Sequence, residues 1–302
     1  DLYKDRSLRA AVEGKRILIT GGSSGIGAAA AHQLAAAGGI PILVARSLDK
    51  LEEVRDEIVA AGGVAHVYSC DLSDLSSIDK LVKDVLADHG GVDVLVNNAG
   101  RSIRRSIKLS YDRFHDLERT MQLNYFGAVR LITGLLPSMT AQKRGHIVNV
   151  SSIGVQTGAP RFSAYVASKA ALDAYSRIAA AETVGHGVTF TTIHMPLVRT
   201  PMIAPTKMYD AFPAISPDEA GGMVCEAVRS RPKSINTKLG TTAEVLYALA
   251  PKVVDQVLHL AFKAFPDSAA AKGKGEAPSP DEDPRLSGEQ LALAHVLKGV
   301  HW

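Results

Sequence analysis

The chain has 302 residues, and its 34 Lys and Arg against 31 Asp and Glu leave a net charge of +3. This near balance excludes a strongly basic nucleic-acid-binding protein and an acidic tail protein. The two cysteines, Cys70 and Cys225, lie in no CxxC pair and near no histidine cluster, so disulfide frameworks and zinc ribbons are excluded too.

Short β-branched runs alternate with Ala-rich helical stretches along the first two thirds of the chain. The strand-like runs are 17–20, 41–45, 64–69, 92–96, 146–150 and 188–194. This alternation is typical of βαβ units that build a parallel sheet, and the runs are apolar throughout, as expected when helices cover both faces. The sequence therefore predicts a doubly wound α/β Rossmann fold with a seven-stranded parallel sheet and helices on both faces.

The pattern predicts a main domain with additions at both ends. The predicted segments are an N-terminal leader (1–14), the α/β domain (15–240) with a substrate lid at about 197–230, an amphipathic helix (241–266), and a flexible tail with a short terminal helix (267–302). The wide apolar stripe over 242–265 fits core packing, a dimer contact or a membrane surface, and we favour the first two.

A glycine-rich turn follows the first predicted strand. Its residues Gly21, Ser23, Ser24, Gly25, Ile26 and Gly27 lead into an Ala-rich helix. Glycines let the backbone approach a pyrophosphate, and the N-terminus of the helix supplies free N–H groups. In this strand–turn–helix context the motif predicts a dinucleotide site, although glycine-rich turns after strands also occur without one.

The residues after the next strands indicate which dinucleotide binds. Arg46 stands where an NAD site would carry Asp or Glu, and a guanidinium pairs well with a 2′-phosphate. We therefore predict NADP(H), with Ser23 and Ser47 as additional donors; the alternative is that Arg46 is simply solvated. Two further loops are expected in the same crevice. They are Asp71–Leu72, beside the adenine, and the Asn97, Ala99 and Gly100 turn.

A tyrosine and a lysine four residues apart form the candidate catalytic pair. Tyr165 and Lys169 fall on one face of a predicted helix, where the ammonium is expected to lower the pKa of the phenol and suit it to general acid catalysis. Ser152, after a buried strand, can add a hydroxyl donor to the same substrate oxygen. A lone YxxxK pattern would also fit a solvated helix face.

Together these motifs resemble the short-chain dehydrogenase/reductase family, in order and in spacing, over residues 15–200. The resemblance implies that Tyr165 donates the proton, that Ser152 polarises the substrate carbonyl, and that Lys169 binds the nicotinamide ribose. It also implies that Asn124 holds a water that relays protons, and that Val198 and Thr200 contact the cofactor. One element departs from the family pattern, because Pro196 stands where the family usually has glycine, which leaves the path of that loop open.

Two segments, 98–107 and 195–207, look like those of bacterial long-chain fatty acyl-CoA reductases. That resemblance implies reduction of an acyl-CoA thioester to a fatty aldehyde. Arg101, Arg104 and Arg105 would attract the CoA phosphates at the mouth of the cleft, unless they form a solvated loop or a contact between subunits. The residues expected to line an apolar lid for the acyl chain are Met202, Met208, Tyr209 and Phe212.

Other functions and partners stay open. A carbonyl reductase acting on a ketoacyl thioester or a hydroxysteroid would use the same four residues. A non-catalytic NADP-binding module is disfavoured, because it has no need of a proton donor. We also expect a homo-oligomer without nucleic acid, in the cytoplasm or in peripheral contact with a membrane. The absence of an initiator Met suggests part of a longer multidomain chain.

Overall fold

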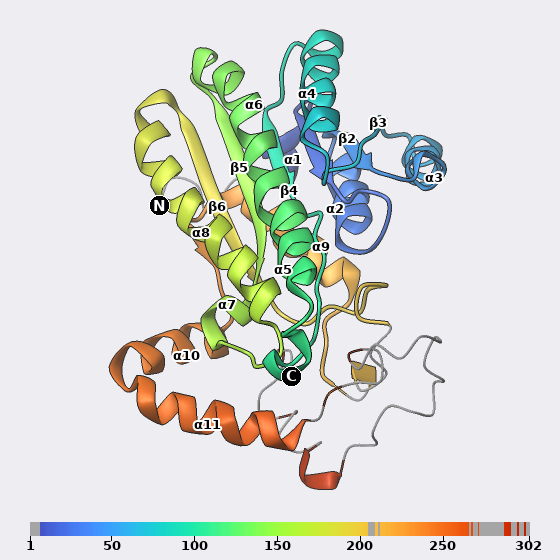
Figure 1. Ribbon diagram of the computed structural model, residues 1–302. Helices are drawn as coiled ribbons and strands as arrows, with labels where there is room; N and C mark the ends of the chain where they lie inside the picture. Colours follow the sequence, from blue (N-terminus) through green and yellow to red (C-terminus); the bar gives the residue numbers. More distant parts are fainter. Residues whose placement is uncertain are drawn as a thin grey trace.

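A central sheet lies between two helical layers, and a pair of helices projects from one end (Figure 1). The computed structural model describes residues 7–204, 209–210, 212–265, 267, 271, 287–290, 295 and 299.

The sheet has seven strands, and all of its neighbouring pairs are parallel. The strands are β1 (Arg16–Thr20), β2 (Ile40–Ala45), β3 (His66–Ser69), β4 (Val94–Asn97), β5 (Gly145–Ser152), β6 (Val188–Met195) and β7 (Ser234–Ile235). Their order is β3-β2-β1-β4-β5-β6-β7, which confirms the predicted doubly wound sheet. The chain order reverses between β1 and β4, and at such a switch point open α/β sheets bind ligands.

Helices cover both faces of the sheet, and α10 and α11 project beyond its end (Figure 1). They are α1 (Leu8–Val12), α2 (Gly25–Ala36), α3 (Leu48–Ala60), α4 (Leu75–His89), α5 (Phe114–Met121), α6 (Ala128–Ala141), α7 (Ile153–Thr157), α8 (Ser163–Thr183), α9 (Pro217–Ser230), α10 (Lys238–Leu249) and α11 (Pro251–Ala264). One core lies under α2, α3 and α9, and the other under α4, α6 and α8. A π-helical turn, Gln122–Gly127, joins α5 to α6.

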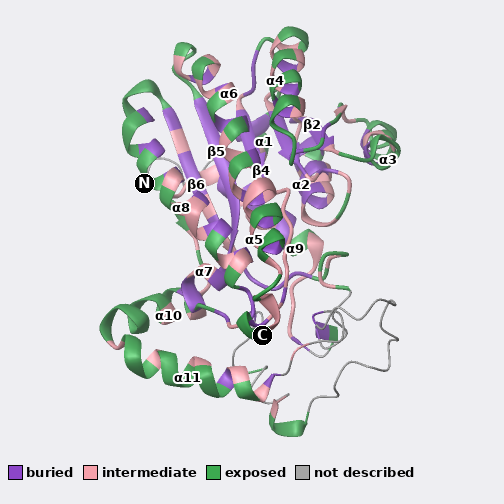
Figure 2. Cartoon of the chain, in the orientation of Figure 1, coloured by how far each residue is buried: buried purple, intermediate pink, exposed green. Residues whose placement is uncertain are grey.

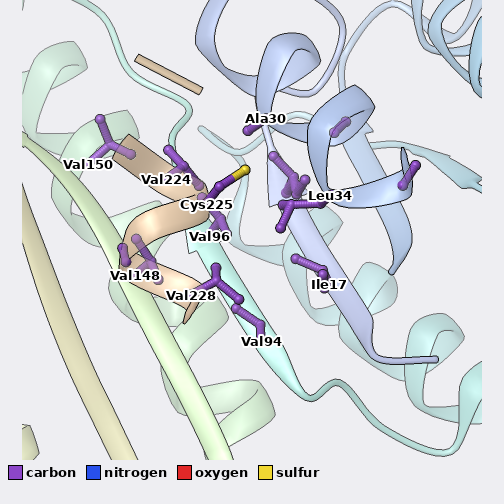
Figure 3. Packing of buried hydrophobic residues seen from close by; sticks show 14 of the residues in the cluster. Ile17, Ala30, Leu34, Val94, Val96, Val148, Val150, Val224, Cys225 and Val228 are labelled. Carbon is purple, nitrogen blue, oxygen red and sulfur yellow. The ribbon is translucent and has the colours of Figure 1, made fainter. Parts of the chain in front are cut away.

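The first core places α9 inside the domain. Val224 and Val228 of α9 are buried against the sheet and α2, close to Ile17 and Leu34 (Figure 3). The helix begins at a capping box formed by Ser216 and Glu219. The predicted lid of 197–230 is therefore too long, because its last 14 residues form the core helix α9. The predicted leader also contributes here, since Ala11 and Val12 of α1 are buried in the same cluster.

The predicted helix of 241–266 is two helices. Ala250 leaves the helical conformation, with φ −142° and ψ 59°, and Pro251 begins α11. A proline cannot continue the hydrogen-bond ladder of α10, so the chain turns there. The inner side of α11, with Ala261, and the following Phe265 pack into a third apolar cluster that also contains Tyr165.

Arg161 ties this C-terminal pair of helices to the domain. Its backbone is left-handed, with φ 72°, and its buried guanidinium donates to Asp267 Oδ1 (3.1 Å) and to the Phe262 carbonyl (3.0 Å). The Arg161 carbonyl accepts from the Arg105 N–H at 2.7 Å, and the Ser106 N–H donates to Asp267. One residue thus joins α11, Asp267 and the loop that follows β4.

Within the described ranges, no helix has the length and apolar character needed to cross a membrane.

Candidate active site

A cleft with a volume of about 200 Å³ opens where β1, β4, β5 and β6 end. It is lined by the glycine-rich turn, the turn after β4, the end of β5, the start of α8 and the loop after β6. The lining residues are Gly21, Ser24, Gly25, Ile26, Asn98, Ala99, Gly100, Val150, Ser151, Tyr165, Lys169, Met195, Pro196, Val198, Thr200, Pro201, Met202 and Ile203.

The glycine-rich turn is fixed against the turn after β4. Gly21 has φ +68°, and a Cβ on Gly27 would lie 2.2 Å from the Gly21 carbonyl oxygen. Thr20 Oγ1 accepts from the N–H groups of Asn98 and Ala99, each at 3.0 Å, and Asn98 Nδ2 donates to the Thr20 carbonyl at 2.9 Å. Only glycine fits at position 27, and the turn presents backbone rather than side chains to the cleft.

The structure brings the four predicted catalytic residues together, and all four are buried. Lys169 Nζ donates to the Val150 carbonyl at 2.8 Å, and Ser152 Oγ accepts from the Gly154 N–H at 3.0 Å. The Ser152 hydroxyl acts on the Tyr165 phenol and lowers its pKa. A Cβ on Gly100 would meet Asn124 Oδ1 at 3.3 Å and Lys169 Nζ at 3.4 Å, so the glycine brings these two groups to one point.

Asn124 lies in the π-helical turn and holds the loop after β4. Its Oδ1 accepts from the Arg101 N–H at 2.8 Å, and its Nδ2 donates to the Arg101 carbonyl and to Ser168 Oγ, each at 2.9 Å. A π-turn inside a helix commonly marks a functional position, because it redirects side chains that a regular helix would point elsewhere.

The electrostatics of the tyrosine–lysine pair differ from the prediction. Burial raises the pKa of Tyr165 to about 12, against the opposing effect of the hydrogen bond with Ser152. Burial also lowers the pKa of Lys169 to about 8, and the charge of Asp173 opposes this shift. The expectation that Lys169 lowers the pKa of Tyr165 is therefore wrong here, because removing the phenol from water outweighs any help from the ammonium.

Sequence reasoning missed Asp173, one helical turn after Lys169. Its Oδ2 accepts from Ser151 Oγ, which is beside the cleft, and contacts His194 Nε2, each at 3.0 Å. His194 Nδ1 in turn lies 2.6 Å from Asn236 Oδ1. In the sequence, only the i, i+4 spacing of Asp173 from Lys169 indicates that the two side chains lie close together.

The residues expected to surround the adenosine are at the ends of β2 and β3. Arg46 and Ser47 are exposed, and the Arg46 carbonyl accepts from Ser69 Oγ at 2.9 Å. Asp71 is exposed as well, and its side chain accepts from the Ser73 N–H. Leu72 is buried, with its carbonyl against Gly127. These positions lie on the same edge of the sheet as the glycine-rich turn.

Two predicted cofactor residues lie elsewhere than expected. Asn97 is buried and donates to Asn149 Oδ1 at 2.8 Å, so it braces β4 against β5 and does not line the cleft. Ser23 is half-buried in the glycine-rich turn, and it too is absent from the lining. The loop after β6 keeps its place despite Pro196, because Val198 pairs with Ile215 and Thr200 Cγ2 approaches Gly25.

The predicted arginine cluster does not present its charge at the mouth of the cleft. Arg104 is buried and hydrogen-bonded to Tyr209; burial raises the pKa of that phenol, and the arginine opposes the shift. Arg105 pairs with buried Asp116 at 3.2 Å. Arg101 is partly exposed. Arg104 is buried and Arg105 is half-buried because each contacts a buried partner that the sequence did not reveal.

The apolar lid residues divide into two groups. Tyr209 and Phe212 are buried with Tyr165, Phe162 and Phe265, whereas Met202 borders the cleft and is half exposed. Met208 lies outside the described residues. The wall beside Tyr165 is therefore aromatic.

The comparisons with protein families and with known proteins point to the same family. The profile of the short chain dehydrogenase family matches residues 15–209. An uncharacterized oxidoreductase of Mycobacterium tuberculosis is 53% identical over 100% of this chain and 89% of its own length. The fatty acyl-CoA reductase of Acinetobacter baylyi is 52% identical over 96% of both chains.

Solved structures agree with these relatives. A metagenomic short-chain oxidoreductase in complex with NADP is 33% identical, with a TM-score of 0.65 over 75% of this chain and 98% of the other. The 3-oxoacyl-(acyl-carrier-protein) reductase of Agrobacterium tumefaciens, with NADP bound, is 27% identical, with a TM-score of 0.70 over 77% and 97% of the two chains.

Proposed function

Since the chain belongs to the short-chain dehydrogenase family and is an oxidoreductase, we propose that it reduces long-chain fatty acyl-CoA thioesters to fatty aldehydes with NADPH. The observation that carries this proposal is the 52% identity to a fatty acyl-CoA reductase over nearly the whole of both chains. The buried Asn124, Ser152, Tyr165 and Lys169 group supports it, because a reductase needs a proton donor.

The cleft suits a dinucleotide. Added Cβ atoms on Gly21 or Gly27 would meet the opposite backbone or Asn98, so only glycine lets this turn close tightly at the start of α2. The unpaired N–H groups at the N-terminus of such a helix suit a phosphate group. The cofactor is proposed to be NADP(H), held by this turn with its 2′-phosphate paired to exposed Arg46. NADP-bound relatives of the same family support this assignment.

The chain's own residues polarise the thioester and supply a proton. When bound, NADPH supplies a hydride to the carbonyl carbon. The buried hydroxyls of Ser152 and Tyr165 donate to the carbonyl oxygen as negative charge develops on it. Tyr165 then gives its proton to this oxygen, which forms the hemithioacetal. As the carbon–sulfur bond breaks, the hydroxyl returns its proton to the Tyr165 phenolate, which leaves the aldehyde and CoA thiolate. Cys70 and Cys225 are both buried outside the cleft, so no acyl-enzyme is proposed.

The test follows NADPH oxidation with palmitoyl-CoA while free thiol is measured in parallel. We expect one thiol for each aldehyde formed. NADPH oxidation of a ketoacyl thioester or a hydroxysteroid ketone without thiol release, together with no activity on palmitoyl-CoA, would replace this proposal with a carbonyl reductase.

Replacement of Arg46 by Asp is expected to raise the KM for NADPH about 10- to 100-fold, because one or two charge-assisted hydrogen bonds to the 2′-phosphate are lost. The KM for NADH should stay unchanged or fall. Initial rates with each cofactor measure the change. The matched control is Lys83→Asp, because Lys83 is exposed on α4 away from the cleft and makes the same change of charge. An equal rise for both cofactors would show that Arg46 supports the fold and does not select the phosphate.

Activity is expected to fall above a pH of about 8, where buried Lys169 loses its proton. Asp173 raises the pKa of Lys169, so the Asp173→Asn variant should show this fall at lower pH. The profile of kcat/KM against pH gives the midpoint for each protein. Glu182→Gln, an exposed change on the same helix, should leave the midpoint in place. If the midpoint of the pH profile did not move in Asp173→Asn, Asp173 would not control the pKa of Lys169, and its role would be only to hold Ser151 and His194 in place.

A further inference from the structure

Large apolar side chains are exposed together on α10 and α11. Leu249 is 78% exposed, Leu260 65% and Val253 63%, and four others on these helices are about half exposed. Figure 2 shows both helices mainly exposed, at the end of the molecule from which they project. Contiguous apolar surface of this kind marks an interaction site, whereas single exposed apolar residues do not.

The two sides of α11 have different roles. Leu258 and Ala261 face the third cluster and account for the packing of the helix on the domain. Val253, Val257 and Leu260 follow the i, i+4, i+7 spacing of a second stripe, and all three are exposed. We call these three residues the outer stripe. The fold does not use it.

A basic row runs beside the outer stripe. Lys252, His259 and Lys263 are exposed and spaced i, i+7 and i+11, which places them on one flank of α11. Asp255 is the single acidic residue of this helix. Long lysine side chains can rest their stems on an apolar surface and keep the ammonium in water.

An apolar stripe with a basic flank is complementary to an anionic lipid surface, where acyl chains lie beneath phosphate groups. A second copy of the chain would offer this face an apolar stripe of its own together with the same excess of positive charge. The charge pattern therefore favours lipid over a symmetric partner.

The outer stripe also connects with the candidate active site. The opposite side of α11 and the following Phe265 form part of the aromatic wall that includes Tyr165, Tyr209 and Phe212. A membrane bound by the outer stripe would thus be separated by α11 alone from the aromatic residues beside the substrate site.

We propose that α11 docks on an anionic membrane surface through its outer stripe and basic row, and holds the cleft next to the bilayer that contains its acyl substrate. The docking depends only on the outer stripe and the basic row, while its use for substrate capture rests on the proposed function.

Vesicle co-sedimentation of the full chain tests the docking. We expect binding to vesicles of mixed phosphatidylcholine and phosphatidylglycerol, weaker binding to phosphatidylcholine alone, and loss of the difference at high salt. The triple variant Val253→Ser, Val257→Ser and Leu260→Ser should bind about tenfold more weakly, because it removes apolar area without touching the core. The Lys252→Gln and Lys263→Gln pair should lose the preference for anionic vesicles.

The matched control changes exposed apolar residues elsewhere, with Val59→Ser, Ile178→Ser and Val184→Ser, and should bind as the parent does. Activity on a water-soluble short-chain acyl-CoA should be the same in all variants. Equal vesicle binding by the outer-stripe variant and the parent, or no binding by the parent, would overturn the docking. The docking would also be overturned if sedimentation velocity showed a dimer for the parent and a monomer for the outer-stripe variant, while neither protein bound lipid. Binding to vesicles without thiol release from palmitoyl-CoA would leave the docking and refute the proposed function.

Discussion

Replacement of Tyr165 by Phe is expected to lower kcat about 10² to 10⁴-fold, because it removes a proton donor that no neighbouring group replaces. The ring would keep its place, since its edge-on contact with Phe162, at 6.3 Å between centroids, does not involve the hydroxyl. Ser152 would keep the hydrogen bond that it accepts from the Gly154 N–H. NADPH affinity should therefore change little, and a fluorescence titration alongside the kinetics separates binding from chemistry.

Tyr175→Phe is the matched control for this experiment. Tyr175 lies on the same helix, is partly buried and packs edge-on against Tyr125, outside the lining of the cleft. Its hydroxyl should be dispensable for turnover. If Tyr165→Phe also retained its turnover, another group would have to protonate the substrate, and the proposed mechanism would be wrong.

Replacement of Gly27 by Ala is expected to abolish NADPH binding and to lower the free energy of unfolding by about 1–3 kcal/mol or more. The new Cβ would lie 2.2 Å from the Gly21 carbonyl oxygen and 2.8 Å from Asn98 Nδ2. The carbonyl is backbone and cannot rotate away, so the turn and the start of α2 must move apart. Urea denaturation and the same fluorescence titration measure both losses.

Gly185→Ala is the control for the added methyl group. A Cβ at this position would meet nothing within 4 Å, and its backbone is not left-handed. Its stability and NADPH affinity should match those of the parent. A Gly27→Ala variant that binds NADPH normally would show that the glycine-rich turn adapts, and that the cofactor does not depend on the close approach of these two segments.

Local pattern was enough to predict most of the sheet. Residues 17–20 and 146–150 are buried at every position because helices cover both faces, and their largely apolar, β-branched sequences favour a parallel strand. Strand β7 was missed, since two residues carry no periodicity. The catalytic group was also accessible from sequence, because Tyr165 and Lys169 are one helical turn apart and Ser152 ends a strand.

What the sequence could not supply depends on distant partners. Arg104 and Arg105 read as exposed charge until their contacts with Tyr209 and Asp116 are known. The direction of the Tyr165 pKa shift depends on how completely the fold buries the phenol, which spacing alone does not report. Pro251 itself was visible in the sequence and could have indicated the break between two helices. The apolar periodicity continues on both sides of this proline, and the sequence was therefore interpreted as one helix.

The left-handed residue at position 161 makes the far end of the chain a structural support for the reaction centre. Its guanidinium binds Asp267 and the Phe262 carbonyl, while its own carbonyl holds the segment leading away from β4. Tyr165 follows only four residues later in the chain, so the same contacts steady the entry into the helix that carries the proposed proton donor. Trimming the protein before Phe262 would therefore remove an anchor and not merely shorten an appendage. A minimal catalytic fragment of this enzyme has to extend through Asp267.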